Sequence, residues 1–187
     1  MDALPSRHAR LTGTIEIALA PGQAFTLFTP TGERAWAPGW DPQFPSPGTD
    51  ETEPGTVFRT DHGDKQSIWA VFHRDPGKSI GYVVTTPGER CGLVTVNCQP
   101  TPNGTKATVV YDLTSLSPDA DAELELFAAN YPSFLSHWQH AIAWATEETA
   151  NRSCPLGPGC KGSASIVTEA GAPLSESSSA STASPET

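Results

Sequence analysis

Residues 119–148 read DADAELELFAANYPSFLSHWQHAIAWATEE, and this stretch decides the fold. Its apolar side chains recur at steps of three and four residues; they are Phe127, Tyr131, Phe134, Leu135, Trp138, Ile142 and Ala145. At about 100° per residue these side chains fall on one stripe of a helix. Pro132 removes one backbone hydrogen bond, so we expect the helix to kink or restart there. A helix with such a stripe needs an apolar surface against which it can pack.

The sequence before residue 55 predicts one strand and two short helical segments. Residues 11–19 alternate apolar and polar side chains, as a half-buried strand does. Residues 21–28 predict a short helix, because Pro21 stands at a first-turn position where its missing N–H costs nothing. A second helical turn is expected around residues 31–36, followed by a loop rich in Pro, Gly and acidic residues over 43–55.

Residues 55–117 predict five strands joined by short turns. The turn signals lie at residues 61–64, 76–77, 87–89 and 103–104, where Gly, Pro, Asn and Asp gather. Connections this short force neighbouring strands to run antiparallel. The sequence therefore supplies an antiparallel meander as the partner of the helix.

The turns also predict which side chains share a face of the sheet. A two-residue turn at the second signal places His73 opposite Ile80, and one at the last signal places Val96 opposite Tyr111. One face then collects most of the large aromatic residues; its members are Phe58, Thr60, Trp69, Val71, His73, Ile80, Tyr82, Val84, Val94, Val96, Cys98, Val109, Tyr111 and Leu113. We expect this face to meet the helix stripe, with the functional site between them.

Length and composition predict one domain with a core, since the chain has 187 residues of which 37% are hydrophobic. We expect an N-terminal arm over residues 1–10, the domain over 11–149 and a disordered tail over 150–187, where Ser, Ala, Gly and Pro dominate without periodicity. Cys154 and Cys160 lie in that tail, where a disulfide is sterically possible but unexpected in a reducing compartment. Their role stays open.

Charge and motifs narrow the possible partners. The formal net charge is −10 without a Lys/Arg cluster, which argues against nucleic acids and anionic membrane surfaces. No run of about 18 apolar residues and no secretion signal is present, so we expect a cytoplasmic protein that is not an integral membrane protein. No phosphate loop or dinucleotide fingerprint is present, and we expect no cofactor. His137 and His140 lack a third ligand, so no metal site is predicted.

The order of strand, two short helices, meander and long helix is that of the helix-grip fold, an α+β fold in which a curved antiparallel sheet wraps around a long C-terminal helix. Over about residues 11–146 the chain resembles the START-like superfamily, which includes polyketide cyclases, lipid-transfer domains and plant hypersensitivity-related proteins. The segments that carry the resemblance are LFTPTGER (27–34), AWAPGWDP (35–42), Trp69, the Asp75-Pro76 turn, Ile80-x-Tyr82, residues 105–114 and residues 131–138. The resemblance implies an elongated cavity for a hydrophobic small molecule, and it carries over no fixed catalytic signature.

The predicted register assigns residues to that cavity. The expected ligand-binding residues are Trp36, Phe58, Thr60, Trp69, Val71, Tyr82, Val96, Tyr111, Phe134 and Trp138. The phenols of Tyr82 and Tyr111 either orient a ligand carbonyl and stabilise a developing enolate, or pack in the core with satisfied hydroxyls. His73 is either a general base at the cavity mouth or a solvated residue at a strand end. These three residues are the catalytic candidates, and whether the chain is an enzyme stays open.

Two classes of function remain. The first is binding of a hydrophobic small molecule, with or without cyclase- or dehydrase-type turnover; Trp36 and Arg34 then form a lid, or else they only anchor their loop. The second is a protein-interaction module, similar to a chaperone regulator, without small-molecule turnover. A cavity of several hundred Å³ favours the first, whereas a filled interior with an exposed apolar patch around Ile68, Phe72 and Leu93 favours the second. The oligomeric state is not predicted.

Overall fold

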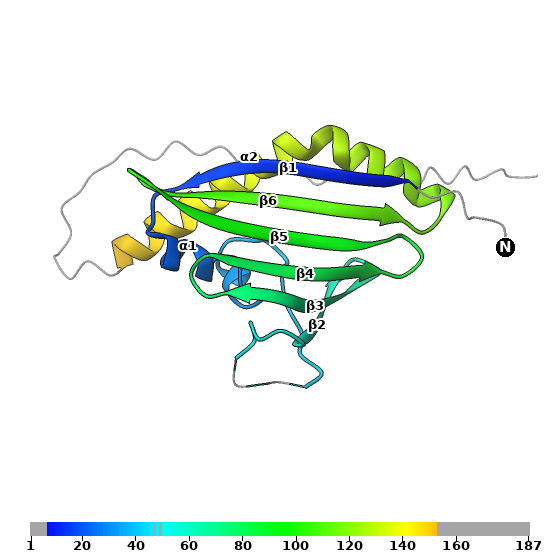
Figure 1. Ribbon diagram of the computed structural model, residues 1–187, viewed down its shortest axis with the longest axis horizontal. Coiled ribbons are helices and arrows are strands. Elements are labelled where there is room, and N and C mark those ends of the chain that lie inside the picture. The colour runs from blue at the N-terminus through cyan, green and yellow to red at the C-terminus, as the bar shows by residue number, and fades with distance from the viewer. Residues whose placement is uncertain (1–6, 47, 49, 153–187) are drawn as a thin grey trace, which may run out of the picture. The chain divides into compact units, whose positions relative to one another are not determined.

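The computed structural model describes residues 7–46, 48 and 50–152. In these residues six strands form one antiparallel sheet in the order β1-β6-β5-β4-β3-β2 (Figure 1). The strands are β1 (His8–Ile17), β2 (Val57–His62), β3 (Lys65–Asp75), β4 (Ser79–Thr86), β5 (Arg90–Thr101) and β6 (Gly104–Ser115). The helix α1 (Pro21–Thr26) and the 3₁₀ turn η1 (Gly32–Ala35) follow β1, and the helix α2 (Pro118–Arg152) follows β6. This arrangement confirms the predicted α+β helix-grip fold.

The helix α2 packs its apolar stripe against the sheet (Figure 1). Leu135 and Ile142 on this stripe are buried, and Tyr131 is buried with its hydroxyl donating to the Val109 carbonyl at 2.9 Å. α2 is one helix through Pro132, so it does not restart there. The space between helix and sheet is thus fixed by contacts along most of the stripe.

The β3–β4 connection differs from the prediction, and the difference moves His73. The loop holds three residues, 76–78, where the prediction had two. A bulge at Phe72 absorbs the extra residue, so the register beyond it is as predicted. Between loop and bulge the alternation is inverted, and His73 pairs with Gly81 instead of Ile80. The prediction that His73 lies on the helix-facing side is therefore wrong, and its side chain is exposed.

The β5–β6 turn also lies one residue earlier than predicted, at residues 102–103. Val96 consequently pairs with Val109, and Tyr111 pairs with Val94. Because each partner moves by two residues, every side chain keeps its predicted face. The row Tyr82–Val94–Tyr111 then crosses three adjacent strands on the helix-facing side.

The ends of the domain differ slightly from those expected. β1 begins at His8, so residues 8–10 of the expected arm belong to the sheet. The tail residues 153–187, with Cys154 and Cys160, lie outside the described residues. Among the helices of the described part, none has both the length and the hydropathy that a membrane crossing requires.

Replacing Gly92 with alanine is expected to destabilise the fold by about 1–3 kcal/mol, the usual cost of overpacking. A Cβ at this position would lie 2.0 Å from the Asp112 carbonyl oxygen and 2.8 Å from the Leu113 Cα, which are backbone atoms that cannot rotate away. The control is Gly22→Ala in α1, where an added Cβ meets no described atom within 4 Å. Urea unfolding of both variants measures the effect, and a Gly92→Ala protein as stable as the wild type would contradict it.

Candidate functional site

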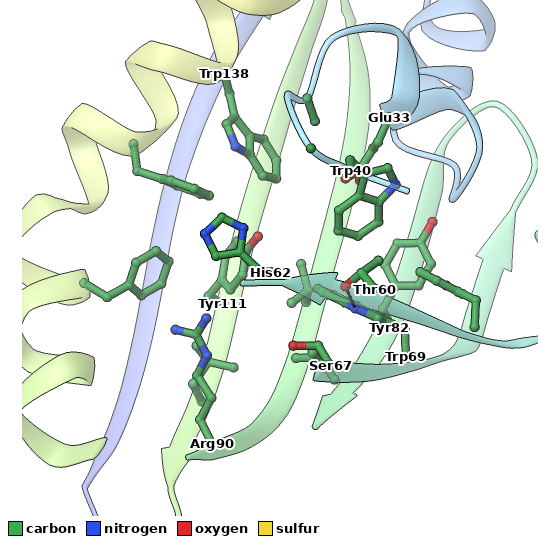
Figure 2. Close-up of a pocket in the computed structure, with 18 of the residues that line it drawn as sticks. Glu33, Trp40, Thr60, His62, Ser67, Trp69, Tyr82, Arg90, Tyr111 and Trp138 are labelled. Atoms are coloured by element: carbon green, nitrogen blue, oxygen red, sulfur yellow. Dashed lines mark hydrogen bonds between the residues drawn. The ribbon is translucent and has the colours of Figure 1, made fainter. Parts of the chain in front are cut away.

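A cavity of about 310 Å³ lies between the helix-facing side of the sheet, α2 and the loop that follows η1 (Figure 2). α2 contributes Phe127, Phe134 and Trp138, and the η1 region contributes Glu33 and residues 37–40. The remaining lining residues come from the sheet, and the cavity opens to solvent beside the exposed Asp61 and His62. This volume falls at the lower end of the range for pockets that bind small organic ligands.

Most of the predicted ligand-binding residues border this cavity; they are Phe58, Thr60, Trp69, Tyr82, Val96, Tyr111, Phe134 and Trp138. Trp36 and Val71 do not border it. Val71 has an exposed fraction of 2% and belongs to the packed core beside the cavity. The alternation of side chains along the strands thus predicted which strand residues form the cavity wall.

The aromatic wall on the loop side is Trp40, not Trp36. Trp36 is buried, and its indole N–H donates to the Leu27 carbonyl at 2.7 Å, so it anchors the loop from behind. Trp40 borders the cavity, donates to the Pro30 carbonyl at 2.7 Å and places its ring centroid 5.4 Å from that of Trp69. Two hydrogen-bonded indoles therefore fix this loop, and one of them faces the cavity.

Arg34 also fixes the loop and is not among the residues that border the cavity. Its guanidinium donates to Asp41 at 2.7 Å and to the Pro42 carbonyl at 3.0 Å. These contacts agree with the expectation that Arg34 anchors its loop, and they leave it no contact with the cavity.

The two tyrosines of the central row differ in what their hydroxyls contact. The Tyr82 hydroxyl donates to the Phe28 carbonyl at 2.7 Å, whereas the Tyr111 hydroxyl has no hydrogen-bond partner among the described residues. Burial, and next the nearby Glu33 carboxyl, raise the pKa of both phenols. Both therefore stay protonated near neutral pH, and Tyr111 is the one whose donor is left for a ligand.

His73 lies outside the cavity, with its ring 2.9 Å from the Ser79 hydroxyl. The strand β2 brings a different histidine to the site, because His62 shares the face of Thr60 and borders the cavity (Figure 2). The sequence pattern contained this signal, since residues two apart on a strand share a face. His62 is exposed, so it stands in contact with solvent.

Glu33 is a buried carboxyl that sequence reasoning missed. It borders the cavity with an exposed fraction of 9%, and its carboxyl has no hydrogen bond or ion pair within the described residues. Burial raises the pKa of this carboxyl well above its ordinary value. Glu33 lies in the 3₁₀ turn η1, and its sequence neighbourhood carries no pattern that marks it as buried.

Arg90 is a further charged residue at the cavity that the prediction missed. It opens β5 on the face of Val94 and Val96, and its guanidinium carbon lies 5.6 Å from the Phe127 ring centroid. Figure 2 shows Arg90 and Glu33 entering the cavity from different sides. The cavity thus combines aromatic walls with a carboxyl, a phenol and a guanidinium.

Within the part of the chain that the structure describes, no three His, Cys, Asp or Glu side chains are grouped so that they could hold a metal ion. His137 and His140 are both exposed on α2.

Solved structures of low sequence identity share this fold. An uncharacterised protein of Rhizobium leguminosarum aligns with a TM-score of 0.57 at 17% identity, covering 74% of this chain and 97% of its own. A protein of Rhizobium loti aligns with a TM-score of 0.54 at 18% identity, over 73% and 99% of the two chains. DynU16, a protein of the dynemicin biosynthetic locus, aligns with a TM-score of 0.50 at 16% identity, over 73% of this chain and 47% of its own.

Family membership comes from sequence. The search of curated proteins gave no match. A family model described as polyketide cyclase/dehydrase and lipid transport matches residues 8–137, which are most of the described domain. With the helix-grip fold and the register above, this match places the chain in the polyketide cyclase/dehydrase and lipid transport family.

Proposed function

We propose that this protein binds an apolar, ring-containing or acyl ketone in the cavity between the sheet and α2 and catalyses its dehydration or cyclisation. The single observation that carries the proposal is a cavity of about 310 Å³ at which the Glu33 carboxyl and the Tyr111 hydroxyl have no hydrogen-bond partner among the residues that the structure describes. The described part of the chain holds no fully buried side-chain nitrogen or oxygen without a partner, so the oxygens of both groups keep some contact with the cavity space and are open to a ligand there.

The walls support an apolar ligand. Trp69 stacks on Phe58 with centroids 5.9 Å apart and an interplanar angle of 4°, and Phe134 lies 4.9 Å from Trp138. Flat aromatic faces of this kind contact rings and acyl chains over large areas, and they exclude water from the reacting groups.

The two polar groups support chemistry at a carbonyl. In a concerted dehydration, one oxygen of the protonated Glu33 carboxyl gives its proton to the departing β-hydroxyl while the other oxygen takes the proton from the α-carbon. The C–O and C–H bonds break, a C=C bond forms and water leaves, with Glu33 returned to its initial state. The Tyr111 hydroxyl donates to the carbonyl oxygen, which carries the developing enolate charge. His73, the general base that the sequence suggested, takes no part in this step, because it does not border the cavity.

One observation favours the alternative function, a protein-interaction module. Ile68, Phe72 and Leu93 are 45%, 44% and 40% exposed on the outer side of the sheet. That function also expected a filled interior, and the cavity of about 310 Å³ speaks against it. Small-molecule binding is therefore the function that we propose first.

Replacing Trp69 with alanine is expected to weaken binding of the uncharged dye Nile red about 10- to 100-fold, because the lost contact area is worth roughly 1.5–3 kcal/mol. Fluorescence titration of the folded protein measures the affinity, with circular dichroism as the check on folding. The matched control is Trp144→Ala, since Trp144 is 73% exposed on α2. Equal affinity in both variants, or no dye binding by the wild type, would contradict the proposed function.

A further inference from the structure

Arg90 is a cation that faces the cavity without an acidic partner. Among the described residues, its contacts are the Phe127 ring at 5.6 Å and an electrostatic influence on Tyr111. The acid next to it in the chain, Glu89, pairs with Lys65 at 2.8 Å. In a protein of formal net charge −10, an unpaired guanidinium at an aromatic cavity needs an explanation.

The other arginines that the structure describes do not offer the same arrangement. Arg10 and Arg34 pair with Asp112 and Asp41, each at 2.7 Å. Arg59 has no ion pair either, but it lies on the outer side of β2 and does not border the cavity. The combination of an unpaired guanidinium and a position at the cavity is thus particular to Arg90 within the described part of the chain.

We infer that the ligand carries a carboxylate that binds Arg90, with its carbonyl or hydroxyl end between Tyr111 and Glu33. This inference rests on the proposed function and names its substrate class: an apolar ring or acyl ketone with an acid group at one end. A planar guanidinium can donate two parallel hydrogen bonds to the two oxygens of a carboxylate. The contact with the Phe127 ring helps to orient the Arg90 guanidinium.

The spacing along β5 sets the length of such a ligand. Arg90 precedes Val94 by four residues, and Val94 pairs with both Tyr82 and Tyr111. At about 3.3 Å per residue, the two positions lie roughly 13 Å apart along the strand. The arginine side chain covers part of this distance, which leaves room for two fused rings or a short acyl chain between the carboxylate and the central row.

The other ionisable groups at the cavity are Glu33, Asp61 and His62. Glu33 enters from the η1 side, and burial raises its pKa, which disfavours a negative charge there. Asp61 is exposed at the rim and accepts a hydrogen bond from Gln66 at 3.0 Å. Asp61 opposes an anion from the rim on β2, whereas Arg90 lies on β5 beside Phe127.

The test compares 2-naphthoate with its uncharged analogue 2-naphthamide, each displacing Nile red from the full chain. Wild-type protein is expected to bind the naphthoate about tenfold or more tightly than the amide, as charged hydrogen bonds imply. Arg90→Gln is expected to remove this preference and to leave the affinity for the amide within about twofold. Arg90→Lys keeps the positive charge but cannot form two parallel hydrogen bonds to a carboxylate, so we expect a preference between that of the wild type and that of Arg90→Gln.

The matched control is Arg59→Gln, which changes the net charge equally and is expected to leave both affinities unchanged. Equal affinity of wild-type protein for the two probes, or a preference that persists in Arg90→Gln, overturns the inference. Failure of both probes to displace a dye that does bind overturns it as well. These outcomes leave the proposed function intact, whereas a wild-type protein that binds no dye fails the proposed function itself.

Discussion

Replacing Glu33 with glutamine is expected to remove a loss of stability that the wild-type protein shows as the pH rises above the ordinary pKa of a glutamate. Burial raises the pKa of Glu33 in the folded protein well above the value it has in the unfolded chain. Between these two pKa values the folded state binds more protons than the unfolded state, so the free energy of unfolding falls as the pH rises. Glutamine has the same shape and does not titrate.

At a pH above the pKa of Glu33 in the folded protein, the expected size is roughly 1 kcal/mol, near the lower end of the cost of desolvating a polar group, because the Glu33 oxygens keep some solvent contact. Thermal unfolding measures it, at about 2–4 °C per kcal/mol for a chain of this size. Glu53→Gln is the matched control, because Glu53 is an exposed acid with the same charge. Identical pH dependence in wild type and Glu33→Gln would contradict the burial of this carboxyl.

The unpaired state of Glu33 links stability to function. A glutamine or an apolar residue at this position would spare the fold the cost of burying an ionisable group. Natural sequences break local rules of this kind mainly at functional sites, where the cost is offset by a gain in binding or chemistry. The same residue is therefore expected to destabilise the protein without its ligand and to interact favourably with a bound one.

The fold followed from periodicities that tolerate small errors. The stripe of α2 depends on a spacing of three and four residues, and it was unaffected by Pro132. The predicted face of Tyr111 is correct although the β5–β6 turn was predicted one residue too late. Its partner on β5 changes by two residues, from Val96 to Val94, and such a change keeps the face. The face of His73 was predicted wrongly, because the β3–β4 loop has one residue more than expected. The bulge at Phe72 that compensates for this residue has no signature in the local sequence pattern.

The site was less predictable, because it depends on which of several similar residues a loop turns inward. Trp36 and Trp40 both belong to the quoted segment 35–42, and only their bonds to the Leu27 and Pro30 carbonyls decide which ring borders the cavity. These contacts join residues in irregular backbone, where neither a period of two nor one of 3.6 applies. The site residues that lie on strands were predictable, because side chains on a strand alternate between its two faces.

Replacing Val94 with phenylalanine is expected to abolish Nile red binding while leaving the free energy of unfolding equal or higher. Val94 lies at the centre of the row between Tyr82 and Tyr111, and its side chain borders the cavity. The added ring atoms occupy the space that a ligand would use, and filling a void typically adds about 0.5–2 kcal/mol of stability. Dye titration and urea unfolding of the same sample measure the two effects.

The matched control is Val71→Phe, because Val71 is equally buried on the same face of the sheet but does not border the cavity. There the same added volume meets packed atoms, so a loss of about 1–3 kcal/mol is expected, with dye binding retained by the folded protein. If instead Val94→Phe keeps its affinity for the dye, the cavity is not the binding site. The exposed apolar residues Ile68, Phe72 and Leu93 would then be the surface to test, and the interaction function would take precedence.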